Sequence, residues 1–547
     1  MKLTLPVLAS TAALASAQWH AGGHGAHGFG RGWEWGSDGY SGHGGHMHAL
    51  AGNPTSSGYE NSTFDQLIDH ENPHLGTFSQ FYYYSDEFWK GPGSPVILFT
   101  PGEINATRYY TYLGTNRTTG LLAEKIGAAV IVLEHRYWGL SSPFAELTTE
   151  NMQYLTLDNA LQDLNYFASN VKLPFAKNIS SNAADVPWVI MGGSYSGALS
   201  AWLANVYPGT LWAYHASSAP VQAISDYWAY FLPIQEGMPK NCSKDVTLVI
   251  DHMDDILTNG TTQEIHDLKA KFMMETVEHN DDFMDALANG PYLWQGNQFY
   301  TNTGFFTWCD YIENAVNSTG STIAGPDGVG LEKALDGYAS WWKTIGLPGT
   351  CAATGYWTGN YSTECFDTYN ASSPVFTDTS LSNQYDRQWE WMLCNEPFGY
   401  WQTGAPENRP TIVSRLVTPE YFIRQCSLYF PPGPEGQTYG IAKGKTEAQE
   451  NAYTGGWFID NTTRLIFVNG QNDPWRESGV SAELRPGGPL QGTSQVPVEI
   501  VPGGYHASDL VSQNGEVNPA VQAVQDRILQ QLADWVAEYP RKQYWKA

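Results

Sequence analysis

The strongest structural signal in the chain is the run Val186-Pro187-Trp188-Val189-Ile190-Met191, which passes directly into Gly192-Gly193-Ser194-Tyr195-Ser196-Gly197. The apolar run, the glycine turn and the helix-favouring residues 198–206 predict a strand, a tight turn and a helix. A serine at such a turn has its hydroxyl raised above the end of a sheet, as in a nucleophile elbow. The usual pattern is Gly-x-Ser-x-Gly, and Ser196 stands at the second glycine here. Ser194 is therefore a candidate nucleophile, and a Gly/Ser turn of purely structural use is the alternative.

A nucleophilic serine needs a base, and the base needs a carboxylate that orients it. Asp473 follows the apolar run 465–468, and His506 follows the apolar run 496–501. Both residues thus lie in loops at the carboxyl ends of predicted strands, the edge at which catalytic groups gather in open α/β sheets. The order Ser194, Asp473, His506 is that of a hydrolytic triad on such a sheet.

The strand pattern recurs along the chain. Short apolar runs bounded by Gly and Pro lie at residues 81–84, 95–100, 128–133 and 211–214, with helical stretches at 157–171 and 198–206 between them. This alternation predicts an α/β fold with a doubly wound, mostly parallel sheet. After Asn518-Pro519 comes an apolar stripe at helical spacing, which predicts a terminal helix packed on the sheet. Its members are Val521, Val524, Ile528, Leu532 and Trp535.

The middle of the chain breaks this pattern. Between residues 226 and 449 the strand signals thin out, Trp and Tyr become frequent, and helical patterns appear at 246–257 and 262–277. We therefore expect a helical cap at 226–449, inserted into an α/β domain made of residues 56–225 and 450–547. All six cysteines fall in the cap, an even number that allows three disulfides in any of 15 pairings. They are Cys242, Cys309, Cys351, Cys365, Cys394 and Cys426.

The composition is that of a globular protein, with 42% hydrophobic and 15% charged residues. The formal net charge of −27 disfavours nucleic acid and anionic membranes as partners. It suits an acidic medium and solubility at neutral pH equally well. No CxxC pair occurs, and we expect neither a metal ion nor another cofactor.

The N-terminus reads as a secretion signal. An apolar stretch followed by Ala15-Ser16-Ala17 predicts a signal peptide over residues 1–17, and residues 18–55 form a His/Gly-rich flexible leader or pro-segment. If cleavage follows Ala17, the new terminus Gln18-Trp19-His20 is a candidate Cu(II) ligand, with a solvated tail as the plain alternative. No other run is long and apolar enough for a membrane anchor. We expect a secreted, extracellular protein, or alternatively a vacuolar or lysosomal one.

Sites for N-linked glycans support this route through the secretory pathway. Ten Asn-x-Ser/Thr sites occur, at Asn61, Asn105, Asn116, Asn178, Asn241, Asn259, Asn317, Asn360, Asn370 and Asn461.

Several independent motifs in order resemble the S28 family of serine peptidases, above all its fungal acid prolyl endopeptidases. They are Thr100-Pro101-Gly102-Glu103, Glu134-His135-Arg136-Tyr137-Trp138-Gly139, the Ser194 turn, Trp389-Glu390-Trp391 with Cys394-Asn395-Glu396-Pro397, 469–475 and 503–510. The resemblance runs from about residue 59 to the C-terminus. It implies an α/β-hydrolase fold with a helical cap, and cleavage after proline in peptides or proteins at acidic pH.

On that resemblance, Ser194, Asp473 and His506 are the triad. The backbone amides of Tyr195 and Gly102 are the expected oxyanion donors. A proline ring needs a compact apolar slot, and Trp475 and Trp391 are candidate walls, although either also suits an ordinary core.

Glu103, His135 and Arg136 lie in two of these motifs, and each has an expected role. Glu103 is a candidate receptor for the terminal amine of a substrate, although the sequence around it departs from the animal members of the family. His135 and Arg136 are expected to be structural, with the arginine paired to a buried carboxylate or carbonyls.

Other functions remain open at this point. A proline-specific carboxypeptidase or dipeptidyl peptidase shares the same motifs, and a serine carboxypeptidase of another type, a lipase or an esterase shares the order of the triad. A non-catalytic binding protein on a hydrolase fold is a further alternative, which the complete triad disfavours. The sequence predicts no oligomeric state.

Overall fold

The computed structural model describes residues 59–177, 179–316, 324–459 and 462–540. The predicted signal peptide (1–17) and leader (18–55), with the candidate copper ligand, lie outside the described residues, as do the glycosylation sites Asn178, Asn317 and Asn461.

An eight-stranded sheet forms the centre of the molecule, in the order β1-β2-β4-β3-β5-β6-β9-β10. β2 pairs antiparallel with β1 and β4, and from β4 to β10 every neighbouring pair is parallel. This sheet, with its helices and a serine turn after β5, confirms the predicted α/β-hydrolase fold. The strands are β1 Glu60–Leu67, β2 Thr77–Ser85, β3 Val96–Phe99, β4 Ala129–Leu133, β5 Trp188–Gly193, β6 Ala213–Ser217, β9 Leu465–Gly470 and β10 Val498–Val501.

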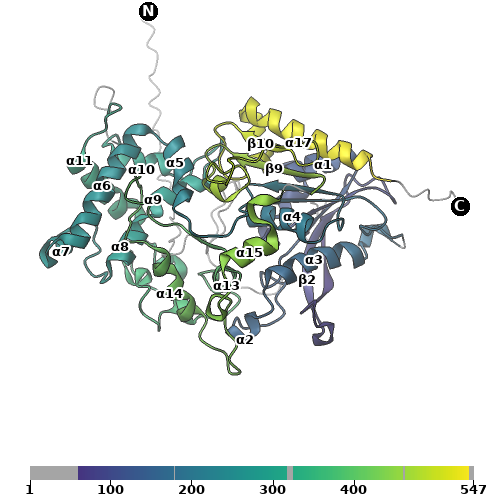
Figure 1. The fold of residues 1–547 in the computed structure, drawn as a ribbon, viewed down its shortest axis with the longest axis horizontal. Coiled ribbons are helices and arrows are strands. Elements are labelled where there is room, and N and C mark those ends of the chain that lie inside the picture. The colour runs from purple at the N-terminus through teal and green to yellow at the C-terminus, as the bar shows by residue number, and fades with distance from the viewer. Residues whose placement is uncertain (1–58, 178, 317–323, 460–461, 541–547) are drawn as a thin grey trace, which may run out of the picture.

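Helices cover both faces of this sheet. Successive residues of a strand point to opposite faces, so each strand contributes side chains to both. Val96 and Leu98 of β3 join one apolar core with helices α3 (Leu157–Asn170) and α4 (Tyr195–Val206). Ile97 and Phe99 join a second core on the other face. There α1 (Thr118–Ile126) and the long terminal helix α17 (Pro519–Ala537) pack together (Figure 1). The short helices α2 (Thr149–Met152) and α16 (Ser512–Val517) complete this part of the chain.

The chain leaves the sheet after β6 and returns to it at β9. The intervening residues are mainly helical and gather to one side of the sheet (Figure 1). Two short strands, β7 (Ile224–Asp226) and β8 (Gly399–Trp401), form a parallel pair there. The helices are α5 Leu232–Gly237, α6 Lys240–Asn259, α7 Thr262–Lys271, α8 Asn280–Leu287, α9 Asn289–Tyr292, α10 Phe305–Ile312, α11 Leu331–Trp341, α12 Pro374–Thr377, α13 Arg387–Asn395, α14 Pro419–Tyr429 and α15 Glu447–Thr454.

Three disulfides lie within this insertion: Cys242–Cys309, Cys351–Cys365 and Cys394–Cys426. The predicted boundary at residue 450 falls inside α15, which also contacts the sheet domain, since Asn205 of α4 donates to the carbonyl of Thr454 at 2.9 Å. The division of the chain into two domains stays a prediction.

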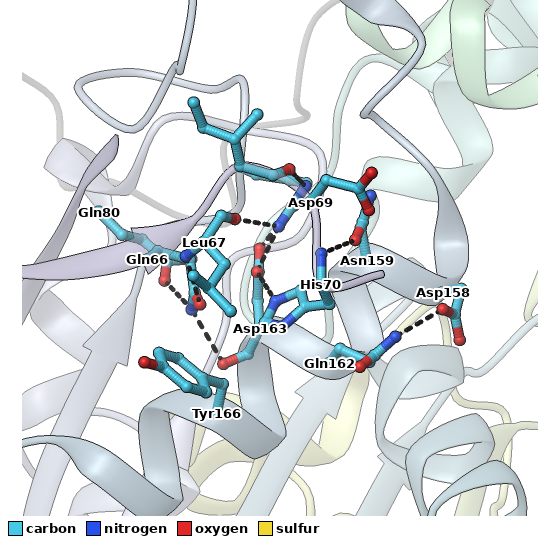
Figure 2. Close-up of polar contacts among 12 residues, drawn as sticks. Gln66, Leu67, Asp69, His70, Gln80, Asp158, Asn159, Gln162, Asp163 and Tyr166 are labelled. Carbon is cyan, nitrogen blue, oxygen red and sulfur yellow. Dashed lines mark hydrogen bonds and ion pairs between the residues drawn. The ribbon is translucent and has the colours of Figure 1, made fainter. Parts of the chain in front are cut away.

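A buried arginine joins the end of β1 to helix α3. Arg136 follows β4 and donates to both carboxylate oxygens of Asp163, with N–O distances of 2.6 and 2.5 Å. Its remaining donors reach the carbonyls of Leu67, Ile68 and Tyr154. His70 also contacts Asp163, at 2.8 Å, and Figure 2 shows these two side chains facing each other. The expected structural role of Arg136 is confirmed.

We predict that Asp163→Asn destabilises the fold by about 3–5 kcal/mol, because it leaves the buried guanidinium of Arg136 without its counter-charge. Urea denaturation would measure the loss. Asp526→Asn, on the exposed side of α17, is the control and should stay within about 0.5 kcal/mol of the native protein. Equal stabilities of the two variants would contradict the prediction.

Candidate active site

Ser194 lies at the turn between β5 and α4 in a backbone conformation that side-chain-bearing residues rarely adopt, with φ 58° and ψ −134°. Its amide donates to the carbonyl of Ser217 on β6 at 3.0 Å. Two glycines make the turn possible. A Cβ on Gly192 would lie 2.1 Å from the Ser196 carbonyl oxygen, and one on Gly197 would lie 2.6 Å from the Ser217 carbonyl oxygen. This geometry is that of a nucleophile elbow.

The residue that departs from the usual elbow pattern has a function of its own. The Ser196 hydroxyl donates to the Gly193 carbonyl at 2.8 Å and accepts from the Gly193 amide at 3.0 Å. The side chain therefore closes the turn instead of crowding it, which explains how serine replaces the second glycine.

Asp473 and His506 meet at the carboxyl edge of the sheet, as the sequence predicts. Asp473 follows β9, His506 follows β10, and both side chains are buried. Asp473 Oδ1 lies 2.9 Å from His506 Nδ1. Since a carboxylate accepts, Nδ1 is the donor in this pair, and Nε2 is the nitrogen that would receive a proton from a serine.

The histidine loop lies directly against the elbow. A Cβ on Gly193 would be 3.5 Å from the Cβ of Ala507 and 2.5 Å from Leu510 Cδ1. The amide of Ala507 donates to the Ser218 hydroxyl at 2.7 Å, just beyond β6. The structure thus brings together the loops of all three predicted triad residues, although their catalytic roles stay a prediction.

A second histidine–aspartate pair lies behind this loop, and the sequence analysis missed it. Asp509 Oδ1 accepts from the Ser217 hydroxyl at 2.5 Å, and Asp509 Oδ2 lies 3.0 Å from His215 Nε2. All three side chains are buried. The available signal was a carboxylate three residues after His506 and a histidine inside an apolar strand.

The two predicted oxyanion donors, Tyr195 and Gly102, lie close to each other. Tyr195 is the first residue of α4, and the loop of Gly102 lies against it. A Cβ on Gly102 would be 3.4 Å from Tyr195 Cδ1 and 3.4 Å from the Ser196 amide. The Gly102 amide itself points to Thr100 Oγ1 at 3.3 Å. Donation by these amides to an oxyanion stays a prediction.

Trp475 lies beside the histidine, with ring centroids 6.4 Å apart. Three tyrosine rings surround its indole at centroid distances of 5.3–5.5 Å: Tyr227, Tyr230 and Tyr400. The side chain is buried in this aromatic cluster. Its predicted role as a wall of a proline slot stays a prediction.

Trp391 is placed differently from what that role requires. Its indole donates to the carbonyl of Leu155 at 2.9 Å and packs edge-on against Phe430. Trp389, on the same helix α13, packs against the residue after Ser194, with its ring 5.1 Å from that of Tyr195. The structure therefore favours Trp389 over Trp391 at this site.

Carboxyl groups and a histidine lie around Tyr195. Glu103 is half-buried, and burial raises its pKa to about 7. Asp386, the N-cap of α13, accepts from the Trp138 indole at 3.0 Å, and burial raises its pKa well above the usual range. His135 lies 3.2 Å from the Tyr195 hydroxyl, and burial lowers its pKa to about 4.

Comparison with known proteins agrees with this geometry. The family model described as "Serine carboxypeptidase S28" matches residues 66–528. The chain is 42% identical over 482 residues to "Serine protease vicPb" of Bipolaris victoriae (strain FI3), covering 87% of this chain and 89% of that protein. It is 29% identical to a "Probable extracellular serine carboxypeptidase" of Arthroderma benhamiae, covering 83% of this chain and 62% of that protein.

We predict that Gly192→Ala lowers peptidase activity at least tenfold, because the new methyl group collides with the Ser196 carbonyl and displaces the turn. Steady-state hydrolysis of a peptide substrate would measure this. Gly114→Ala is the control, since a Cβ there meets no atom within 4 Å. Full activity of Gly192→Ala would show that the turn does not need its close packing.

Proposed function

This chain belongs to the serine carboxypeptidase S28 family and is a serine peptidase, and we propose that it cleaves peptide chains internally, after proline, in an acidic extracellular medium. The observation that carries the proposal is the buried Asp473–His506 pair beside the strained Ser194 turn.

In the proposed mechanism, the Ser194 hydroxyl attacks the carbonyl carbon of the scissile bond while His506 Nε2 takes its proton. Asp473 holds the ring in the required tautomer and stabilises the cation that forms. The Tyr195 amide, with Gly102 as second donor, stabilises the oxyanion. His506 then protonates the leaving amine, and water hydrolyses the acyl-enzyme by the same steps in reverse.

Specificity for proline is supported by the aromatic cluster at Trp475. A proline ring is compact, apolar and without an amide donor, and it packs well on aromatic faces. Trp475 packs beside His506, and three tyrosines pack around Trp475, so this aromatic cluster lies next to the proposed position of the residue before the scissile bond.

An acidic medium is supported by carboxyl groups that burial keeps protonated. Burial raises the pKa of Glu103, Glu313 and Glu450 to about 7 each, and that of Glu390 to about 8. Such groups stabilise the fold as the pH falls, because the folded state binds protons that the unfolded chain releases. His135 has the opposite effect on stability. Because burial lowers its pKa, the unfolded chain binds a proton at this residue more readily than the fold does, and this destabilises the fold as the pH falls.

Secretion is supported by exposed glycosylation sites. Among the described residues, the sites with exposed asparagines are Asn61, Asn105, Asn116, Asn259, Asn360 and Asn370. Asn241 differs, because it is half-buried and donates to Glu313 at 2.9 Å, so we do not expect a glycan there. In the part of the chain that the structure describes, no helix combines the length and apolarity needed for crossing a membrane.

A proline-specific exopeptidase is the second candidate. Glu103 favours it, because this half-buried carboxyl group near Tyr195 could accept a hydrogen bond from the terminal amine of a substrate. One relative is also named as a carboxypeptidase.

The two candidates predict different products from a long unstructured peptide with several internal prolines and both ends blocked. At pH 4–5 we expect internal cuts after proline, mapped by mass spectrometry. Ser194→Ala should lose both cleavage and labelling by a fluorophosphonate, whereas Ser427→Ala, exposed on α14, should retain them. Trimming that begins only when one end is unblocked would instead establish an exopeptidase.

We also predict that the native protein is less stable at pH 8.5 than at pH 4.5, with Glu390 as one cause. The pKa of Glu390 rises from 4.5 in the unfolded chain to about 8 in the fold, so its contribution is lost as the pH rises through this range. Glu390→Gln should recover on the order of 3–5 kcal/mol at pH 8.5 and change little at pH 4.5. Thermal and urea unfolding at both pH values would measure this, with Glu124→Gln, at an exposed position of α1, as the control. A pH-independent effect of Glu390→Gln would refute it.

A further inference from the structure

A short segment of the insertion, residues 294–298, contacts both loops of the proposed triad. The Trp294 indole donates to the carbonyl of Asn472, next to Asp473, at 2.8 Å. Its ring also packs against Tyr505, next to His506, at a centroid distance of 5.3 Å. These loops come from strands β9 and β10, far along the chain, so this segment lies where the insertion meets the catalytic edge of the sheet.

We propose that two glutamines of this segment, Gln295 and Gln298, are positioning residues with separate tasks. Gln295 fixes the aromatic wall of the proline slot and thereby sets specificity. Gln298 fixes the loop of His506 and thereby sets the rate of acyl transfer. The part concerning Gln295 rests on the proposed preference for proline.

Gln295 connects two members of the aromatic cluster through one atom. Its side-chain carbonyl oxygen accepts from the Trp475 indole at 2.9 Å and from the Tyr230 hydroxyl at 2.7 Å. An amide oxygen has two lone pairs, so both bonds can form together. The glutamine is buried, and the two rings it joins lie edge to face at 5.5 Å. This shared acceptor sets the angle between the rings, and therefore the shape of the slot.

Gln298 acts on the backbone of the catalytic histidine. The side-chain nitrogen of Gln298 donates to the backbone carbonyl of His506 at 3.1 Å. Its side-chain oxygen accepts from the side-chain nitrogen of Asn514 at 2.6 Å. Asn514 also donates to the carbonyl of Ser508 at 2.9 Å. The glutamine and asparagine thus hold two carbonyls of the histidine loop, while the Ser218 hydroxyl holds the amide of Ala507 between them.

These contacts predict a division between the kinetic parameters. A change at Gln295 alters which residue fits before the scissile bond, and so changes the ratio of kcat/KM for proline over alanine. A change at Gln298 displaces the base relative to Ser194 and lowers kcat, without altering the slot. A merely structural contribution to folding would produce neither pattern once active sites are counted.

The test uses the full chain and two blocked peptides that differ only in proline or alanine before the scissile bond, with active sites titrated by a fluorophosphonate. Gln295→Met keeps the side-chain volume and removes the acceptor. We expect it to lower the proline-over-alanine ratio at least tenfold, while Gln295→Glu, which keeps an acceptor oxygen, stays within threefold of the native ratio. Equal losses on both peptides, or no loss, would overturn the assignment.

If Gln295→Met yields no titratable protein, Tyr230→Phe takes its place, and an unchanged proline-over-alanine ratio in that variant overturns the assignment equally.

For Gln298→Met we expect kcat to fall at least tenfold, with KM within twofold and the proline-over-alanine ratio unchanged. Gln263→Met, exposed on α7, is the matched control and should resemble the native protein. An unchanged kcat, or a fall in the ratio, would overturn the role of Gln298. If the native protein itself does not distinguish the two peptides, the proposed proline specificity fails, and the Gln298 measurement still stands on whichever peptide is cleaved.

Discussion

The hydrogen bond from the Ser194 amide to the Ser217 carbonyl holds the strained turn on which the proposed active site depends. A serine at φ 58° persists only when its surroundings enforce that conformation. Here β6 supplies the acceptor. Gly192 and Gly197 have no Cβ, so β5 and β6 can pack closely against the backbone of α4. The same strand then organises the base, because the hydroxyl of Ser217 holds Asp509 and that of Ser218 holds the amide of Ala507. One central strand therefore sets the positions of both the candidate nucleophile and its histidine loop.

Several carboxyl groups of the molecule are buried. Burying a charged carboxylate is costly, and the usual response is a raised pKa with loss of the charge. Glu390 on α13 and Glu450 on α15 are buried, and Lys445 forms ion pairs with Glu450, at 2.7 Å, and with Glu396. Protonation of such groups removes the cost of burying their charge.

The sequence was sufficient for the fold and for the loops in which the candidate triad residues lie, because both depend on local patterns. Apolar runs bounded by glycine mark the parallel strands, and each candidate catalytic residue follows one of them. The polar strand β1 has no such run and escaped the analysis, and the helix expected at 262–277 ends at Lys271, close to Met273, whose φ is 59°. Contacts between distant segments were also beyond reach: no pattern indicates that Trp389, not Trp391, faces Tyr195, or that Asp509 meets Ser217 across 292 positions.

The insertion separates the strand that carries the candidate nucleophile from the loops that carry its partners. During synthesis the ribosome releases Ser194 and β6 long before β9 and β10 exist, and the edge of the sheet at β6 stays unpaired until they arrive. Contacts this far apart in sequence form late and slowly in folding. A growing chain therefore carries the candidate nucleophile without the proposed base, and on the proposed mechanism it has no peptidase activity until β9 and β10 have joined the sheet.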